Sequence, residues 1–354
     1  MSRFRSEKFD GLEPYTPGEQ PQDMVYTKLN TNENPFPPCP AAVTAASQAA
    51  KSLMLYPDPD STALVKKLSE VYGVRPSQVI VNNGSDETLY FAFLAFCDEA
   101  HPAVFADLTY GFYPVFASIT GAPYTEIPLE EDFTLDVSKY CGVNKTVFLA
   151  NPNAPTGIPV PLGGIEEILK TNPNNVVVVD EAYVDFGAES AVKLVDRYEN
   201  LLVVQTFSKS RSFAGGRLGF GIGSEALIAD LNAIQYSTNP YNINRMTAAA
   251  GVAILENEEY TRHNCRAIME NRAYTVEALQ ELGFTCTPSK ANFIFVKSDA
   301  IGGKELYLEL KKRGVLIRHF EKPRIKDYNR ITIGSREQMH TLLTAVKEIL
   351  EEIG

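Results

Sequence analysis

In the stretch Leu201-Leu-Val-Val-Gln-Thr-Phe-Ser-Lys209, an apolar run ends in two hydroxyls and an amine. A second run, Val176 to Val179, ends at the carboxylate of Asp180. Continuous β-branched runs are typical of strands that are buried on both faces of a parallel sheet. Ligands of such sheets bind beyond the carboxyl ends of the strands. The two stretches therefore predict a buried sheet with chemically active residues at one edge.

The same alternation of short apolar runs and longer amphipathic segments extends from about Val79 to Gly223. Three further runs cover 79–82, 104–106 and 146–150. This order predicts βαβ units, and hence an α/β domain whose mostly parallel sheet is covered by helices.

The C-terminal part has a different order of elements. It predicts helices at about 258–282 and 304–313 and a last helix through 351, with strands in 284–296, 316–319 and 330–333. We expect a smaller α+β domain there. The residues before 41 are too rich in proline for a helix or a central strand. The predicted division is an N-terminal arm, 1–40, that packs on the small domain or a partner subunit, a large domain, 41–257, and a small domain, 258–354.

Composition and charge exclude several classes of function. The 354 residues carry a formal charge of −11, which disfavours nonspecific binding to nucleic acid or to anionic membranes. No segment is long and apolar enough to span a membrane, and the first residues do not read as a signal peptide, so we expect a cytoplasmic protein. The five cysteines and four histidines lack the spacing of disulfide frameworks or metal sites, so no metal is expected.

The polar residues at the strand ends match the parts of one cofactor. Lys209 is a candidate Schiff-base former, and Asp180 at the end of a buried strand needs a cation. The segment 83–87, Asn-Gly-Ser-Asp-Glu, lies before an apolar helical run and predicts an anion cradle that includes Gly84, Ser85 and Asp86. Further donors to that anion are Thr206, Ser208 and Arg217. Together these groups predict pyridoxal phosphate: lysine for its aldehyde, aspartate for its pyridine nitrogen and the cradle for its phosphate.

Several of these residues also allow a purely structural interpretation. The segment 83–87 can be an ordinary helix cap, and Asp180 can be a carboxylate that is satisfied locally. Tyr110 can stack on the cofactor ring and Tyr183 can bind its hydroxyl, although aromatic residues at strand ends are more often core. The glycine-rich run 215–223 lacks the glycine order, the preceding strand and the acidic residue of a dinucleotide site.

The sequence resembles the fold-type I aminotransferases and, within them, the histidinol-phosphate aminotransferases. The resemblance spans nearly the whole chain. The matching segments are 12–18, 29–35, 56–58, 83–87, 109–113, 151–157, 180–183, 206–209, Arg217 and 330–334.

The resemblance implies a role for each matching residue. Lys209 would carry the cofactor, Asp180 would pair with the pyridine nitrogen, and Tyr110 and Tyr183 would contact the ring and its 3-hydroxyl. Tyr56 would reach the phosphate of the cofactor in the other subunit, which implies a homodimer. The family has an asparagine where this chain has Ala154, so Asn153 is the candidate replacement as a donor to the 3-hydroxyl.

The resemblance also implies the substrates. Arg330 and Arg318 would bind the anionic end of histidinol phosphate, together with Tyr15 and Asn32, and 2-oxoglutarate would accept the amino group in a step of histidine biosynthesis. Arg318 has an alternative reading as a surface ion-pair residue.

Three other functions stay open at this point. An aromatic or broad-specificity aminotransferase and a threonine-phosphate decarboxylase would share the same cofactor residues. A noncatalytic regulatory protein could keep the same fold, but the acidic charge and the absence of a preceding winged-helix segment disfavour it.

Overall fold

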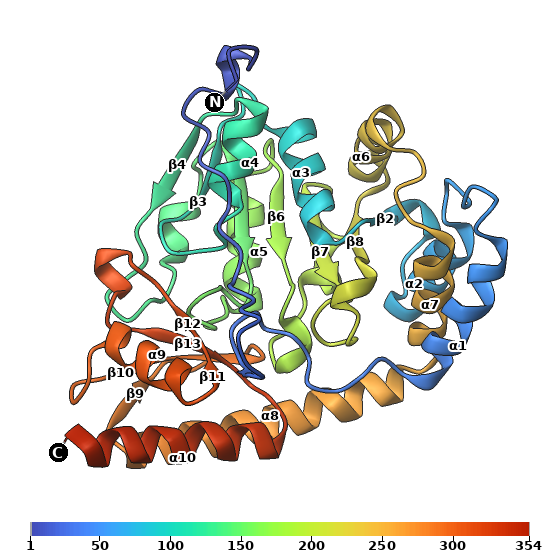
Figure 1. Cartoon of the computed structure of the whole chain (residues 1–354). Coiled ribbons are helices and arrows are strands. Elements are labelled where there is room, and N and C mark those ends of the chain that lie inside the picture. Colours follow the sequence, from blue (N-terminus) through green and yellow to red (C-terminus); the bar gives the residue numbers. More distant parts are fainter. Residues whose placement is uncertain (1, 354) are drawn as a thin grey trace.

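The computed structural model describes residues 2–353, and its centre is a seven-stranded sheet (Figure 1). Six strands run in one direction, and only β8 runs against its two neighbours. In the order of the sheet, the strands are β2 (Val79–Asn82), β8 (Gly219–Gly223), β7 (Leu201–Thr206), β6 (Val177–Asp180), β5 (Thr146–Ala150), β3 (Ala103–Ala106) and β4 (Tyr124–Ile127). The predicted α/β class with a mostly parallel sheet is confirmed.

Helices cover both faces of this sheet. They are α1 (Pro40–Ala49), α2 (Thr62–Tyr72), α3 (Ser85–Phe96), α4 (Tyr113–Thr120), α5 (Leu162–Thr171), α6 (Glu225–Thr238) and α7 (Arg245–Glu256). Successive residues of a strand point to opposite faces of the sheet and pack in different apolar clusters. Val177 and Val203 pack in the cluster that includes α1, α2, α5 and α7. Val178 and Val204 pack in the cluster that includes α3, α4 and α6. Both faces of the sheet are therefore buried, which explains why the sequences of these strands are unbroken apolar runs.

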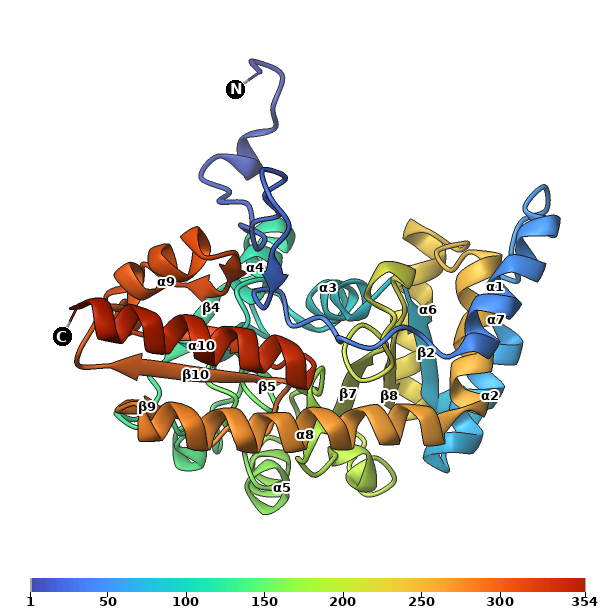
Figure 2. The ribbon, with the colours of Figure 1, turned by 60° about the horizontal axis from the view of Figure 1, so that its bottom comes forward.

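A second, four-stranded antiparallel sheet lies beyond one end of the first (Figure 1). Its strands, in order, are β12 (Arg318–His319), β13 (Asn329–Thr332), β10 (Phe293–Ser298) and β9 (Phe284–Cys286). It packs with α8 (Glu258–Glu281), α9 (Gly303–Lys312) and α10 (Arg336–Ile353). Figure 2 shows α8 running along the molecule from this sheet toward α2 and α7.

The N-terminal arm joins the two parts. Its strand β1 (Thr27–Lys28) pairs in parallel with β11 (Val315–Leu316), and Leu29 is buried in the apolar cluster of the second sheet. Short 3-10 helices complete the chain: η1 (Glu7–Phe9), η2 (Ala50–Ser52), η3 (Pro76–Gln78), η4 (Val137–Tyr140), η5 (Val184–Phe186), η6 (Ala191–Leu194), η7 (Ala214–Gly216) and η8 (Pro323–Ile325). The boundaries at residues 40 and 257 stay a prediction.

The structure differs from the sequence prediction at several strands. The expected strand 316–319 is divided between β11 and β12, which belong to different sheets. Strand β8 was not expected, because its alternating glycines give no strand signal. Strand β4 was also missed, since it is a largely exposed edge strand without an apolar run. The expected strand 284–296 is two strands, β9 and β10, which pair with each other.

Among residues 2–353, no helix combines the length and the apolar character that crossing a membrane requires.

Candidate active site

A cavity of about 490 Å³ opens at the carboxyl ends of the parallel strands, between the large sheet, the small sheet and the arm. Thirteen of the sixteen site residues expected from the sequence line it: Tyr15, Asn32, Ser85, Asp86, Tyr110, Asp180, Tyr183, Thr206, Ser208, Lys209, Arg217, Arg318 and Arg330. The other three, Gly84, Tyr56 and Asn153, do not.

Lys209 follows β7 and has few partners of its own. Its Nζ donates to the main-chain oxygen of Thr31 at 3.4 Å, a long hydrogen bond, and lies 5.9 Å from the centre of the Tyr183 ring. Burial, together with the positive charge of Arg330, lowers the pKa of Lys209 to about 8. A lysine of that pKa has an appreciable fraction of free amine near neutral pH, which a nucleophile or a proton acceptor needs.

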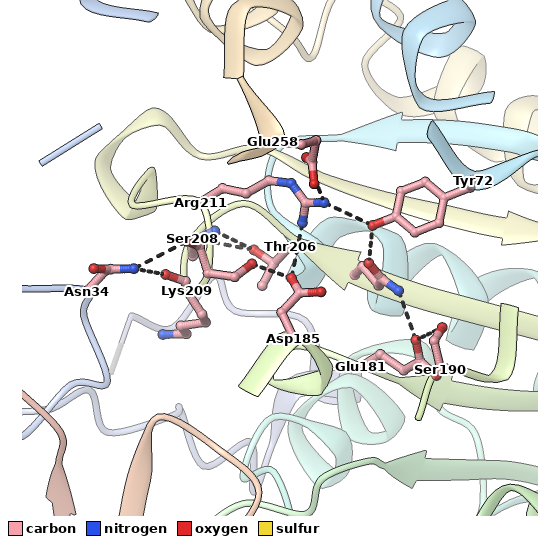
Figure 3. Close-up of polar contacts among 12 residues, drawn as sticks. Asn34, Tyr72, Glu181, Asp185, Ser190, Thr206, Ser208, Lys209, Arg211 and Glu258 are labelled. Atoms are coloured by element: carbon pink, nitrogen blue, oxygen red, sulfur yellow. Dashed lines mark hydrogen bonds and ion pairs between the residues drawn. The ribbon is translucent and has the colours of Figure 1, made fainter. Parts of the chain in front are cut away.

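The main chain around Lys209 is held by the N-terminal arm. The side-chain amide of Asn34 donates to the carbonyl oxygens of Lys209, at 2.9 Å, and Ser210, at 3.3 Å (Figure 3). The sequence prediction did not include Asn34, because its role depends on a contact between segments 175 residues apart.

Asp180 ends β6 and is 6% exposed. Its two oxygens accept hydrogen bonds from the Tyr113 hydroxyl, at 3.0 Å, and from the main-chain N–H of Ala182, at 3.2 Å. Burial raises the pKa of Asp180 to about 6, and the two hydrogen bonds act against that rise. Within the described residues Asp180 forms no ion pair, so a cationic group in the cavity would be its natural partner.

The anion cradle is built differently from the expected capped turn. Ser85 is the first residue of α3 rather than its cap. The cap position is Gly84, which has no side chain that could accept hydrogen bonds from the first N–H groups of the helix. The N–H of Glu87 donates to the Gly84 carbonyl oxygen at 3.3 Å, which leaves the N–H groups of Ser85 and Asp86 for an external acceptor such as a phosphate. Thr206 and Ser208 bring hydroxyls to the same cavity, 3.0 Å from each other.

Gly84 shapes the cradle without lining it. Its φ of +82° is in the left-handed region, and a Cβ there would lie 2.5 Å from Nη2 of Arg217. Arg217 itself has a φ of +52°, which is uncommon for a side chain of this size and typical of functional sites. Only glycine at position 84 lets the guanidinium approach so closely.

The carboxylate of Asp86 is already engaged. It accepts a hydrogen bond from the Tyr110 hydroxyl at 2.7 Å and lies 3.5 Å from Nη2 of Arg217. A carboxylate would repel an anion, so Asp86 can contribute its main-chain N–H and orient Tyr110 and Arg217.

Tyr183 and Asn32 form one unit. The amide nitrogen of Asn32 donates to the Tyr183 hydroxyl at 3.0 Å, while its oxygen accepts from the Thr332 hydroxyl at 3.1 Å. Asn32 was expected to bind substrate, but the structure gives its side chain these two protein partners. Because Tyr183 accepts this hydrogen bond, its own proton stays available for a ligand in the cavity.

Asn153 does not replace the missing amide of Ala154. Its side-chain nitrogen donates to the Leu108 carbonyl oxygen at 2.9 Å and to the Thr156 hydroxyl at 3.0 Å. Ala154 lines the cavity and Asn153 does not, because alternate residues of this segment point to opposite sides. The structure therefore does not support Asn153 as a cofactor contact.

Two arginines face the cavity from the small sheet. Arg330 donates to the carbonyl oxygen of Asn30 at 2.9 Å, and its buried Nε has no hydrogen-bond partner among the described residues. Arg318 donates to the carbonyl oxygens of Thr16 and Pro17, both at 3.3 Å, in the arm. Neither forms an ion pair with the described residues, so both can receive an anionic ligand.

Tyr56 lies outside the cavity and is 76% exposed. Its ring stacks on Tyr241 at 4.7 Å, and its neighbours Leu53, Met54 and Leu55 are exposed as well. A cluster of exposed apolar side chains is typical of a protein interface.

The cavity fits the three ends of pyridoxal phosphate. Asp180 is a buried carboxylate without a cation, Lys209 is an amine with a lowered pKa, and the uncapped start of α3 lies beside Arg217. These three features can bind the pyridine nitrogen, the aldehyde and the phosphate of the cofactor, in that order.

Comparisons with known proteins agree with this geometry. The family model for aminotransferase class I and II matches residues 25–346. The chain is 45% identical over 353 residues to a histidinol-phosphate aminotransferase of Brachyspira hyodysenteriae, covering 99% of this chain and 100% of that one. It is 48% identical to a protein of the same name from Acinetobacter baumannii, covering 98% and 97%.

A solved structure has the same fold. The histidinol-phosphate aminotransferase of Sinorhizobium meliloti in complex with pyridoxal 5'-phosphate superposes with a TM-score of 0.90 and 22% identity, over 100% of this chain and 99% of that one.

Proposed function

Since this chain belongs to the class I and II aminotransferases, we propose that Lys209, Asp180 and Arg330 carry the transfer of an amino group from histidinol phosphate to 2-oxoglutarate. The chain is a pyridoxal-phosphate-dependent enzyme of histidine biosynthesis, as its full-length relatives indicate. The observation that carries the assignment of roles is the cavity, which contains an amine, an unpaired carboxylate and two arginines without carboxylate partners.

The cofactor supplies an aldehyde that condenses with amines and a ring that accepts the electron pair left when the substrate loses a proton. The protein must bind this group, orient it and move protons. In this proposal Lys209 Nζ removes the proton from the carbon that bears the substrate amine. It then delivers that proton to C4′ of the cofactor, the carbon of the aldehyde. Its pKa of about 8 suits both steps near neutral pH.

Asp180 keeps a positive charge on the pyridine nitrogen, and Tyr113 keeps Asp180 in place. The Tyr113 hydroxyl is fully buried and donates to the carboxylate, which lowers the pKa of Asp180 against the effect of burial. Tyr113 is therefore a positioning residue of this site. The sequence prediction did not assign it a role, because only the fold brings it to Asp180.

We expect Tyr113→Phe to weaken cofactor binding by about 10- to 100-fold, since a hydrogen bond to a charged group contributes about 1.5–3 kcal/mol. Titration of the cofactor-free protein with pyridoxal phosphate, followed by absorbance, measures this. Tyr140→Phe is the matched control, because Tyr140 is also buried, lies outside the cavity and has a hydroxyl without a partner in the described residues. Equal affinities for the parent and Tyr113→Phe would contradict the role of Tyr113.

The start of α3 and Arg217 bind the cofactor phosphate in this proposal, with the hydroxyls of Thr206 and Ser208. Tyr110, which Asp86 orients, stacks on the ring, and Tyr183 donates to its 3-hydroxyl. Support comes from the hydrogen bond that Asn32 gives to Tyr183, because it leaves the Tyr183 proton free. Ala154 offers no donor there, so Tyr183 is the side chain on which this contact depends.

In this proposal Arg330 and Arg318 bind the phosphate of the substrate, and Tyr15 lines the same cavity. Among the described residues, the buried Nε of Arg330 has no hydrogen-bond partner, and Arg318 donates to two carbonyl oxygens of the arm. Tyr15 stacks on Phe112 at 4.1 Å, which fixes that part of the arm over the cavity. Guanidinium groups bind phosphate through paired hydrogen bonds.

We expect Arg318→Ala to raise the KM for histidinol phosphate about 10- to 100-fold, because a charge-assisted contact of about 1.5–3 kcal/mol is lost. Steady-state kinetics with varied histidinol phosphate measures it. Arg313→Ala serves as the control, since Arg313 pairs with Glu309 and Glu352 away from the cavity. An unchanged KM for Arg318→Ala would show that Arg318 only holds the arm.

In this proposal the active form is a homodimer, and Tyr56 of each subunit contacts the phosphate of the cofactor in the other subunit. Tyr56 and Met54 are 76% and 81% exposed in the single chain, which supports an interface at this segment.

Mixing two inactive variants tests this arrangement. Lys209→Ala and Tyr56→Ala subunits, unfolded together and refolded, should recover about a quarter of the parent activity, because half of the dimers are mixed and each has one intact site. Refolding each variant alone is the control. If the mixture is no more active than its components, Tyr56 does not act across subunits.

The reaction itself is tested by product formation. Purified protein loaded with pyridoxal phosphate should form glutamate from histidinol phosphate and 2-oxoglutarate. Phenylalanine as the better amino donor would reassign the substrate, and release of carbon dioxide from threonine phosphate would reassign the reaction. We place the enzyme in the cytoplasm, where its five free cysteines would stay reduced.

A further inference from the structure

A polar network lies next to Lys209 (Figure 3), and none of its side chains lines the cavity. Its centre is Arg211, which is only 4% exposed. The guanidinium contacts Asp185 of η5 at 3.3 Å, Glu258 at the start of α8 at 3.3 Å, and the Tyr72 hydroxyl at the end of α2 at 3.1 Å. Three elements far apart in the sequence thus meet at one cation, two residues after Lys209.

The network continues from Tyr72 to the residue after Asp180. The Tyr72 hydroxyl donates to the Gln205 side-chain oxygen at 2.6 Å, and the Gln205 amide donates to Glu181 at 2.8 Å. Glu181 is itself held by the Ser190 hydroxyl and the Ala191 N–H, both at 2.6 Å. An unbroken chain of hydrogen bonds therefore joins the segment that carries Asp180 to the segment that carries Lys209.

A shorter connection fixes Lys209 more directly. The hydroxyl of Ser210 donates to Asp185, the carboxylate that Arg211 also contacts. On the opposite side, Asn34 holds the carbonyl oxygens of Lys209 and Ser210. The main chain at Lys209 is thus held both by the arm and by the network, whereas Lys209 Nζ makes one long hydrogen bond to the described residues.

We propose that Arg211 is a positioning residue of this enzyme: through Asp185 and Ser210 it sets where the main chain presents the Lys209 amine to the cofactor. None of its contacts reaches the cavity, so it acts only through its neighbours. Burying a guanidinium is costly unless its charge is paired. Here the carboxylates of Asp185 and Glu258 and the hydroxyl of Tyr72 stabilise the buried charge. The contact with Asp185 also helps to hold the segment that carries Lys209.

The inference rests on the proposed role of Lys209, and adduct formation tests both separately. In this reaction Lys209 Nζ bonds to the aldehyde carbon of pyridoxal phosphate, and one water molecule leaves. Its rate, measured by stopped-flow absorbance on cofactor-free protein, should fall about 10- to 100-fold in Arg211→Gln, since small misplacements of a reacting group have effects of this size. The pH midpoint of the bound cofactor's absorbance should also shift.

Two further variants separate positioning from loss of stability. Leu342→Ala, in the core of the small sheet, should lower the melting temperature and leave the adduct rate unchanged. Arg211→Lys keeps the charge but cannot make the three contacts, so we expect an intermediate rate. A folded Arg211→Gln protein with the parent's rate and pH midpoint would overturn the inference.

If Arg211→Gln does not fold, Ser210→Ala decides the question, because it removes one hydroxyl and keeps the guanidinium. A slower adduct rate in Ser210→Ala would support the inference, and an unchanged rate would overturn it. No adduct on Lys209 in the parent protein would instead contradict the proposed function.

Discussion

Replacing Lys209 by alanine is expected to lower kcat by at least about 10⁴-fold, the upper range for a positioned general base. The side chain loses both its covalent bond to the cofactor and its proton transfer. The fold should persist, because the only hydrogen bond that Nζ makes to the described residues is a long one, of 3.4 Å, to the main-chain oxygen of Thr31. Single-turnover absorbance measurements with histidinol phosphate give the rate, and circular dichroism checks the fold.

Lys209→Arg is the matched control for charge. Arginine keeps a cation at this position but stays protonated, so it can neither attack the aldehyde nor accept the proton. We expect it to be as inactive as Lys209→Ala. Substantial turnover by either variant would show that another group performs the proton transfer.

Asp180→Asn is expected to weaken cofactor binding by about 10²- to 10⁴-fold, because removing one partner of a buried ion pair costs about 3–5 kcal/mol. The change keeps the size of the side chain. Its oxygen can still accept the Ala182 N–H, and its new amide can donate to the Tyr113 hydroxyl. Only the negative charge that faces the pyridine nitrogen is lost, so equal affinities of Asp180→Asn and parent for pyridoxal phosphate would contradict this role.

The same substitution should have the opposite effect on the stability of the cofactor-free protein. The pKa of Asp180 is raised to about 6 in the folded chain, so the folded state holds a proton that the unfolded state has already released. Stability from this group is therefore present below about pH 4 and is lost as the pH rises to about 6; the loss is about 3 kcal/mol at pH 8. Asp180→Asn should remove that loss.

Denaturant unfolding of the two cofactor-free proteins at pH 4.5 and 8 compares these stabilities. We expect the advantage of Asp180→Asn over the parent to be larger at the higher pH. A difference that is equal at both pH values would mean that burial does not perturb the ionisation of Asp180.

The sequence was informative wherever one segment carries the signal by itself. Lys209 and Asp180 could be found because each ends an apolar run, and the carboxyl ends of parallel strands meet at one edge. Strand β8 was missed, because every second residue is glycine and its burial depends on β2 and β7 beside it. Strand formation there is set by the neighbours rather than by local preference.

Residues that act through distant contacts could not be found in this way. Tyr113 reaches Asp180 across 67 positions, and Arg211 joins Tyr72, Asp185 and Glu258. The opposite mistake concerns Asn153, which was predicted to contact the cofactor. It stands beside Ala154 in the sequence, yet its amide donates to Leu108, whereas Ala154 lines the cavity.

The absorbance spectrum of the purified, cofactor-loaded protein, recorded before and after adding histidinol phosphate, tests the cofactor and the substrate together. We predict that the band of the Lys209-bound cofactor disappears as the amino group is transferred and returns when 2-oxoglutarate is added. A band that stays unchanged with histidinol phosphate but responds to phenylalanine or glutamate would contradict the assigned substrate. No cofactor band after incubation with pyridoxal phosphate would contradict the whole account.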